Sequence, residues 1–189
     1  MPGLGSLVKN QRLLNAVVQR FQRCMTTTTA VMSFGDGNHG ALGLPTSLMG
    51  LGVDAYEPTR VPFLPSDITS VTAGHYHSLA VTSDGQLWAW GRDLEAQLGR
   101  GGSSPRDLWN EPRRVPGLDR VNVYSAFASG VLSAAIGDDG SLWVWGKSKR
   151  GQLGLGEQVM EAVVPSRVEA LSGEKITLML KIGILNDTQ

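Results

Sequence analysis

The stretch LAVTSDGQLWAW, from Leu79 to Trp90, decides how this chain folds. Two apolar runs in it flank the pair Asp84-Gly85, and Asp-Gly tolerates the positive φ that both central positions of a type I′ turn require. The spacing therefore predicts a β-hairpin with a two-residue turn. A second stretch, AAIGDDGSLWVW from Ala134 to Trp145, has the same pattern and predicts a second hairpin.

Both faces of these predicted strands are apolar. Side chains alternate along a strand, so Leu87 and Ala89 face one side while Trp88 and Trp90 face the other. A sheet with water on one face would carry polar residues there. The pattern therefore predicts strands that are covered on both sides, as in stacked four-stranded blades.

The hairpins belong to a unit that recurs along the chain. Its aromatic-Gly pairs are Phe34-Gly35, Trp90-Gly91 and Trp145-Gly146, whose glycines are 56 and 55 residues apart. Each pair is followed by a Leu-Gly pair, a proline and a valine: Leu42-Gly43, Pro58 and Val61; Leu98-Gly99, Pro112 and Val115; Leu153-Gly154, Pro165 and Val168. A fixed period of this size predicts an all-β propeller or a solenoid, in which neighbouring units bury one another's faces.

Four short segments of this unit resemble those of a known family: WAWG at Trp88–Gly91, QLG at Gln97–Gly99, GQLGLG at Gly151–Gly156 and AGHYHSLA at Ala73–Ala80. In these segments the chain resembles the regulator of chromosome condensation repeat family, and its plant mitochondrial members in particular. The resemblance implies blades of a seven-bladed β-propeller. It covers residues 31–176, with one full repeat, a second nearly full repeat and the first half of a third.

The chain departs from the family pattern in two places. The second repeat has Ala128–Ser133 where the first has Ala73–Ser78, and residues 177–189 match no part of the repeat. Seven units of this period would need nearly 400 residues, roughly twice the 189 present. We therefore expect a truncated form: a partial propeller of about two and a half to three repeats with a non-family tail. Its open blade edges predict oligomerisation and marginal stability.

The first thirty residues differ in composition from the rest. They hold Lys9, Arg12, Arg20 and Arg23 but no acidic residue, and their apolar residues recur at near-helical spacing before a threonine tract. An Arg-containing, acid-free, amphipathic segment is typical of a mitochondrial transit peptide. The predicted location is thus the mitochondrion; a disordered tail or surface-binding helix, the chloroplast, and a nuclear or cytosolic protein are the alternatives. Its apolar run is too short and interrupted for a membrane span.

Charge and cysteine content exclude several classes of function for residues 31–189. From residue 31 onward, 13 Lys and Arg stand against 17 Asp and Glu, a net charge of −4. A mildly acidic body argues against bulk electrostatic binding to nucleic acid. The single cysteine, Cys24, lies in the predicted transit peptide, so disulfides and cysteine-based zinc sites are not expected. Because no nucleophile–base pair or carboxylate pair is visible, we do not expect an enzyme.

Two motifs suggest cofactors, and the repeat explains both better. Gly35–Gly40 spells G-x-G-x-x-G, but no strand-loop-helix context accompanies it. Gly35 and Gly40 instead align with turn glycines of the later repeats, which makes Gly37 incidental. His75 and His77 are spaced like a metal pair on a strand, yet a zinc site needs further ligands. We interpret them as blade residues that bond neighbouring backbone groups, and predict no cofactor and no metal.

Exposed basic loops are the remaining candidates for contact with a partner. One stretch lies in the longer insertion between the first and second hairpins and the other follows Trp145. Loops on one rim of a rigid propeller are where partners usually bind, although a solvated loop without a function is the alternative. The candidate residues are Arg106, Arg113, Arg114, Lys147, Lys149 and Arg150.

These observations predict a non-enzymatic scaffold in mitochondria that binds a protein or a ribonucleoprotein. The link to organellar RNA processing or translation is implied by the resemblance alone. The alternative that the family implies is guanine-nucleotide exchange on a small GTPase, through an inserted wedge that we cannot place on any residue here. A third alternative is an inactive form, or one that competes with a full-length relative for partners.

Overall fold

The computed structural model describes residues 29–45, 53–102 and 105–177. The predicted transit peptide, apart from its last two residues, and the predicted tail, apart from Thr177, lie outside the described residues. The described chain contains strands and three short 3-10 helices, and no α-helix. The strands are β1 (Met32–Gly35), β2 (Ala55–Arg60), β3 (Ile68–Ala73), β4 (His77–Thr82), β5 (Leu87–Gly91), β6 (Arg113–Arg114), β7 (Val123–Ser129), β8 (Leu132–Gly137), β9 (Leu142–Lys147) and β10 (Glu161–Arg167). The 3-10 helices are η1 (Asn38–Gly40), η2 (Arg106–Leu108) and η3 (Glu169–Leu171).

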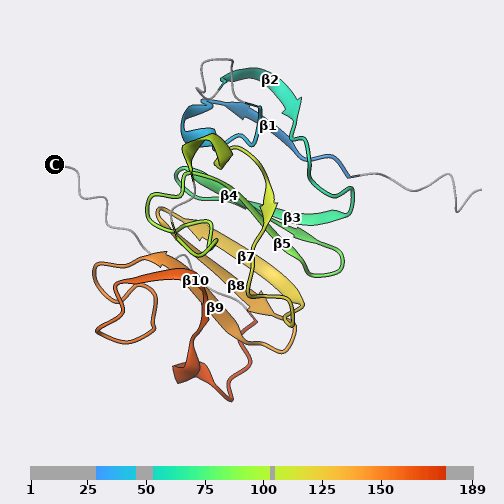
Figure 1. The fold of residues 1–189 in the computed structure, drawn as a ribbon. Coiled ribbons are helices and arrows are strands. Elements are labelled where there is room, and N and C mark those ends of the chain that lie inside the picture. Colours follow the sequence, from blue (N-terminus) through green and yellow to red (C-terminus); the bar gives the residue numbers. More distant parts are fainter. Residues whose placement is uncertain (1–28, 46–52, 103–104, 178–189) are drawn as a thin grey trace, which may run out of the picture.

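The strands form three antiparallel sheets that follow one another along the chain. Sheet A pairs β1 with β2, sheet B has the order β3-β4-β5-β6, and sheet C has the order β7-β8-β9-β10. Figure 1 shows the sheets side by side, with sheet A at the top and sheet C at the bottom. β1, β5 and β9 carry the aromatic-Gly pairs of the three repeats. Sheet A therefore corresponds to the third and fourth strands of the complete sheets.

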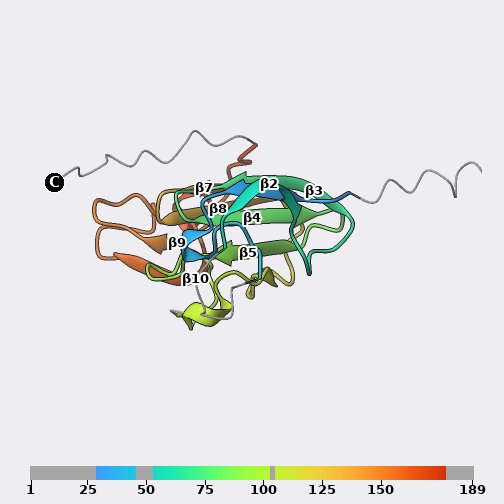
Figure 2. The same ribbon diagram turned by 90° about the horizontal axis from the view of Figure 1, so that it is seen from above.

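The sheets approach each other most closely at one edge. β7, the first strand of sheet C, packs against β3 and β4 of sheet B. Figure 2 shows β3 and β7 along one edge, with η2 beyond the opposite one. Sheets that converge along their first strands fan out like blades around an axis, which confirms the predicted partial propeller.

The prediction that both strand faces are covered is confirmed. Leu87 and Ala89 join the apolar core between sheets B and C, which includes Leu132 and Trp145. Trp90, on the opposite face of β5, packs with Ile68 of the same sheet and with Val31 ahead of sheet A. Alternating side chains of the single strand β5 thus pack sheet B against sheet C on one face and against the start of sheet A on the other.

The predicted type I′ turns are wrong. A loop of three residues, Ser83 to Gly85, separates Thr82 from Gln86, whose backbone N–H and C=O groups bond at 3.0 Å. Only Gly85 has a positive φ, of 76°, and Asp84 does not. This is the three-residue hairpin loop that ends in a left-handed glycine. The Thr82 side chain favours it, because its hydroxyl accepts the Gln86 N–H at 2.9 Å.

The turn glycines of the first repeat behave as predicted, with one exception. Gly35 has a φ of 111° against 106° for Gly146, so the repeat accounts for both. Gly37, however, is not incidental. A Cβ on Gly37 would lie 2.1 Å from the carbonyl oxygen of Val53, and the Gly37 N–H bonds Asp54 Oδ1 at 2.8 Å. This close approach of two backbones requires a glycine.

Candidate functional site

A buried polar joint connects sheets B and C. The carbonyl oxygen of Gln97 accepts a bond from Trp145 Nε1 at 2.8 Å and another from Ser133 Oγ at 2.7 Å. Because Ser133 uses its only proton on that carbonyl, its oxygen accepts from His77 Nε2, 2.9 Å away. His77 therefore bonds a side chain of the next sheet, which the sequence interpretation did not foresee.

The same joint recurs between sheets A and B. There the carbonyl oxygen of Ala41 accepts from Trp90 Nε1 at 3.0 Å and from Ser78 Oγ at 3.3 Å. Ala41 and Gln97 each lie six residues after the glycine of an aromatic-Gly pair. The repeat therefore encodes the contact between blades as well as the strands within them.

The Leu-Gly pair of the repeat is explained by this joint. Gly43 and Gly99 have φ values of 68° and 65°, and a Cβ on either would lie 2.8 Å from the indole of Trp90 or Trp145 respectively. Gly154, in the last repeat, has nearly the same φ of 66° but meets nothing closer than Val168 Cγ1 at 3.8 Å. The first two glycines are thus needed for conformation and for space.

Burial changes the protonation of His77. Loss of hydration lowers the pKa of its imidazole to about 4, although a backbone hydrogen bond at Leu132 acts in the opposite direction. His77 is therefore neutral near pH 7. His75, two residues away, is exposed. Within the described ranges no group of three His, Cys, Asp or Glu side chains could hold a metal ion.

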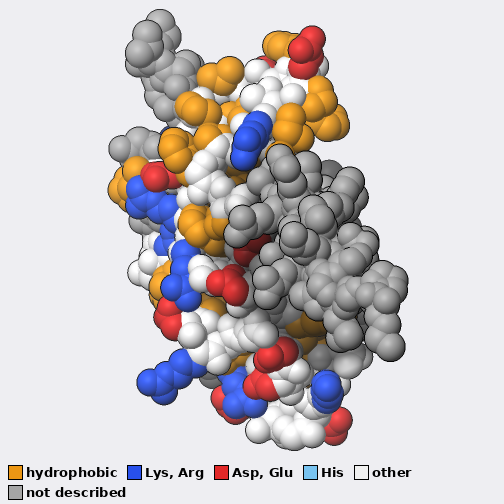
Figure 3. Space-filling view, turned by 90° about the vertical axis from the view of Figure 1, so that its right-hand side faces the viewer, with side chains coloured by type: hydrophobic (Ala, Val, Ile, Leu, Met, Phe, Trp, Pro, Cys, Tyr) orange, Lys and Arg blue, Asp and Glu red, His pale blue; other side chains and the backbone are white. Residues whose placement is uncertain are grey.

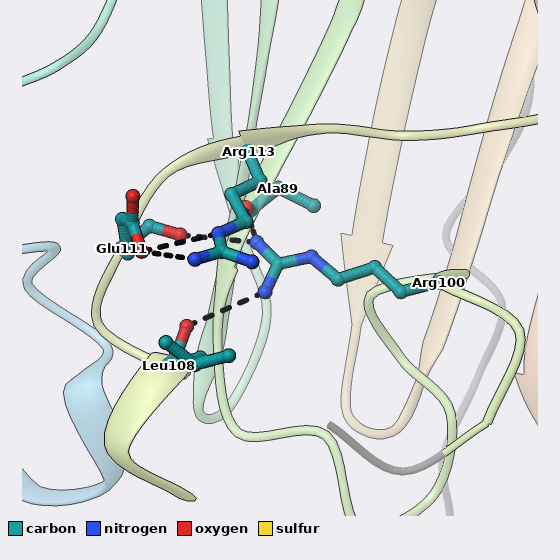
Figure 4. Close-up of polar contacts among 5 residues, drawn as sticks. All are labelled: Ala89, Arg100, Leu108, Glu111 and Arg113. Carbon is teal, nitrogen blue, oxygen red and sulfur yellow. Dashed lines mark hydrogen bonds and ion pairs between the residues drawn. The ribbon is translucent and has the colours of Figure 1, made fainter. Parts of the chain in front are cut away.

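Arg100 fixes the long insertion between β5 and β6, a role that sequence reasoning missed. Its guanidinium donates to the carbonyl oxygens of Ala89 at 2.6 Å, Glu111 at 3.0 Å and Leu108 at 3.4 Å (Figure 4). Burial lowers the pKa of Arg100 to about 10, so the group stays charged. Its positions in the other repeats are Leu44 and Leu155, so the period gave no signal for it.

The predicted basic residues are divided between sheets B and C. Arg113 and Arg114 form β6, where both are exposed and ion-paired, Arg113 with Glu111 and Arg114 with Asp119 at 3.0 Å. Arg106, in η2, lies with its guanidinium 5.6 Å from the ring centre of Trp109. Arg106 lies in the β5–β6 insertion of sheet B, and Arg113 and Arg114 follow that insertion.

The second basic group lies at the end of β9 and in the β9–β10 loop. Lys147 is the last residue of β9, Lys149 and Arg150 follow in the loop, and all three are exposed. The backbone N–H groups of Lys149 and Arg150 both donate to Gln152 Oε1, at 3.0 and 2.7 Å, which gives the loop a defined shape. The use of either basic group in partner binding stays a prediction.

A cluster of rings and guanidinium groups spans the boundary between sheets A and B. Tyr76 contacts His39 edge-on, with ring centres 4.9 Å apart, and His75 at 4.3 Å. Arg92 lies over the Tyr76 ring at 5.3 Å. Trp109 is 6.3 Å from His39. We call this group the aromatic–arginine cluster: His39, His75, Tyr76, Arg92, Arg106 and Trp109.

Sequence reasoning considered the histidines of this cluster as metal ligands and Arg106 as a loop cation, and it gave Tyr76, Arg92 and Trp109 no role. The members of the cluster come from η1, the β3–β4 turn, the end of β5 and the η2 insertion. Backbone hydrogen bonds hold these segments together. The Arg92 N–H donates to the carbonyl oxygen of Tyr76 at 2.8 Å, and the Gly91 N–H donates to the carbonyl oxygen of Trp109 at 2.6 Å. The packing of sheet A against sheet B then adds His39 to the five members that sheet B and its insertion supply.

The repeat matches known sequences and structures. The profile of the regulator of chromosome condensation (RCC1) repeat matches residues 30–81, 84–136 and 139–179. These matches cover most of the chain, so the protein belongs to the RCC1 repeat family. No helix in the described part of the chain has the length and apolar character needed to cross a membrane.

Two curated relatives and one solved structure give the range of similar proteins. The mitochondrial RCC1 domain-containing protein RUG3 of Arabidopsis thaliana is 34% identical over 149 residues, 76% of this chain and 32% of RUG3. The secretion-regulating guanine nucleotide exchange factor of Mus musculus is 34% identical over 164 residues, 83% of this chain and 34% of that protein. The human WBSCR16 crystal structure is 27% identical with a TM-score of 0.61, over 75% of this chain and 34% of that one. The chain thus spans about a third of the length of these two relatives.

Proposed function

We propose that this chain is a non-enzymatic scaffold in mitochondria that binds a protein or ribonucleoprotein partner in organellar RNA processing or translation. The acid-free first thirty residues and the similarity to a mitochondrial family member support the location. The RCC1 repeats support an interaction role, because a rigid stack of blades presents its loops and outer strands to partners.

The observation that carries the proposal is the conformation of Phe63. Its backbone has a φ of 63°, in the left-handed region, and its side chain is 72% exposed. The corresponding residue of the next repeat is Gly117, with a φ of 83°. A bulky residue in this region is strained by about 1–2 kcal/mol. An exposed ring gains no burial energy that would offset the strain, so contact with a partner is the function that accounts for it.

Other exposed apolar side chains belong to sheet A, whose strand β2 ends three residues before Phe63. Tyr56 is 93% exposed, and Met32 and Phe34 are 49% and 66% exposed. Figure 3 shows hydrophobic side chains gathered at the upper end of the molecule, where sheet A lies. Exposed apolar patches of this kind mark interaction surfaces.

Site-specific photo-crosslinking at Phe63, in the full chain expressed in mitochondria, tests the proposal. We expect recovery of mitochondrial ribosomal or RNA-processing proteins from position 63 and not from Tyr124, an aromatic residue of sheet C that is 69% exposed. In a competition experiment, an unlabelled Phe63→Gly chain should not reduce the crosslinking of this partner to position 63, because it lacks the ring that binds the partner. The same substitution should raise the free energy of unfolding by about 1 kcal/mol. Equal yields from both positions, or recovery of chaperones alone, would contradict the proposal.

Guanine-nucleotide exchange is the second candidate, favoured by the similarity to the secretion-regulating exchange factor. Release of fluorescent GDP from a panel of mitochondrial and cytosolic small GTPases distinguishes the two functions. Accelerated release by the chain would show exchange activity and contradict a pure scaffold. Release at the intrinsic rate throughout the panel would leave the scaffold as the better account.

A further inference from the structure

The outer members of the aromatic–arginine cluster are planar groups that solvent can reach. His39, His75 and Arg106 are exposed, Tyr76 and Arg92 are half-buried, and Trp109 is buried. The exposed imidazoles of His39 and His75 contact the half-buried ring of Tyr76, and the exposed guanidinium of Arg106 contacts the buried ring of Trp109. Groups with flat, polarisable faces stack on aromatic rings and on Arg planes.

The cluster is held in place before any ligand arrives. Asn110, next to Trp109, donates from Nδ2 to the carbonyl oxygen of Leu44 at 2.7 Å, which ties the η2 insertion to the loop after η1. Gly40 lies so close to Asn110 that a Cβ would be 2.7 Å from its backbone nitrogen. His39 is held in the left-handed region, with a φ of 61° and a ψ of 14°. A site arranged in advance loses little entropy on binding.

The charges of the cluster decide which ligand it fits. It has two guanidinium groups, and that of Arg92 is already paired with Glu95 at 2.8 Å. From residue 31 onward the chain also carries a net charge of −4. Phosphate attraction alone is therefore too weak to bind a nucleic-acid duplex, whose bases are stacked inside. Unpaired bases offer their faces and require few phosphate contacts.

We propose that the aromatic–arginine cluster binds unpaired nucleobases of a single-stranded nucleic acid, with His39, His75 and Arg106 as the stacking groups. This inference rests on the ribonucleoprotein part of the proposed function. Because at most two cations contact phosphates, the logarithm of the association constant falls with the logarithm of salt concentration with a slope no steeper than about −1.4. Binding driven by charge over many phosphates would give a much steeper slope.

Fluorescence anisotropy of the full chain with dye-labelled 12-nucleotide oligoadenosine, oligouridine and deoxyoligoadenosine tests the proposal. We expect oligoadenosine to bind more tightly than oligouridine, because its larger bases stack better, and a 12-base-pair RNA duplex to bind at least tenfold more weakly. The ribose and deoxyribose probes distinguish RNA from DNA as the source of the bases. A 12-residue oligoglutamate peptide serves as the charged competitor without bases.

Two variants make the test specific. His39→Gly removes the ring at a position whose left-handed backbone suits glycine, so the fold should be kept. It should weaken oligoadenosine binding by about fivefold to a hundredfold, and Arg106→Ala should do the same. Tyr124→Ala, on sheet C, is the matched control and should leave binding unchanged.

Three results would overturn the proposal: no binding of any oligonucleotide, equal binding of the duplex, or full displacement by oligoglutamate with His39→Gly unaffected. The last would assign the surface to an acidic protein segment instead. A negative result here would leave the crosslinking result at Phe63 untouched, because that experiment detects a protein at the β2–β3 loop. The two proposals can therefore fail separately.

Discussion

The joint between sheets B and C predicts how two glycine substitutions in the same motif should differ. Gly99→Ala places a methyl group in the left-handed region, at about 1–2 kcal/mol, and 2.8 Å from the Trp145 indole. That indole is held by its 2.8 Å bond to Gln97, so relieving the overlap would disturb the joint, at about 1–3 kcal/mol more. Gly154→Ala has the same conformational cost, but its nearest neighbour is 3.8 Å away.

We therefore expect Gly99→Ala to destabilise the protein by about 2–5 kcal/mol and Gly154→Ala by about 1–2 kcal/mol. Urea unfolding of the full chain, followed by tryptophan fluorescence, measures both values under the same conditions. The difference between the variants isolates the contact between blades from the backbone conformation. Equal losses in the two variants would refute the argument that the indole occupies the space of a side chain at Gly99.

Three further predictions concern buried polar groups. Because the pKa of His77 is about 4 in the folded chain and about 6.5 when unfolded, the unfolded state binds a proton first as the pH falls. The free energy of unfolding should drop by on the order of 3 kcal/mol between pH 6.5 and pH 4, and His77→Leu should flatten this dependence in urea titrations. Ser133→Ala removes one hydrogen-bond partner from each of two buried groups and should lower the free energy of unfolding by about 2 kcal/mol. Ser78→Ala removes a single, longer bond and should lower it by under about 1 kcal/mol. If thermal melts gave the reverse order, the role assigned to these serines in the joints between sheets would be wrong. Arg100→Met, which frees three carbonyl groups, should cost about 3 kcal/mol, and Arg113→Met, on an exposed ion pair, about 0.5 kcal/mol or less, as calorimetry can check.

The strands and their stacking could be predicted from the sequence, since they depend on local patterns that repeat. Alternating apolar residues around Asp84-Gly85 determine a hairpin wherever it lies in the fold, and burial on both faces follows from Trp90 and Leu87 pointing in opposite directions. A period of about 55 residues then requires equivalent contacts between successive units. The turn type was wrong because a side-chain acceptor closes a three-residue loop in each hairpin. Thr82 Oγ1 accepts the Gln86 N–H at 2.9 Å in the first hairpin, and Asp139 Oδ1 accepts the Ser141 N–H at 2.9 Å in the second.

The candidate binding surfaces depend on the tertiary structure. His39, Tyr76 and Trp109 are far apart along the chain, and no spacing rule relates them, because His39 meets the two rings of sheet B only where sheets A and B pack side by side. The strain at Phe63 is also invisible in a sequence, where a phenylalanine gives no sign of a left-handed backbone. The sequence by itself determined a stack of β-blades of the RCC1 repeat family, because each unit carries its own folding signals. Which side chains meet at the boundaries between units was decided only by the folded chain, because those contacts depend on how whole sheets are placed against one another.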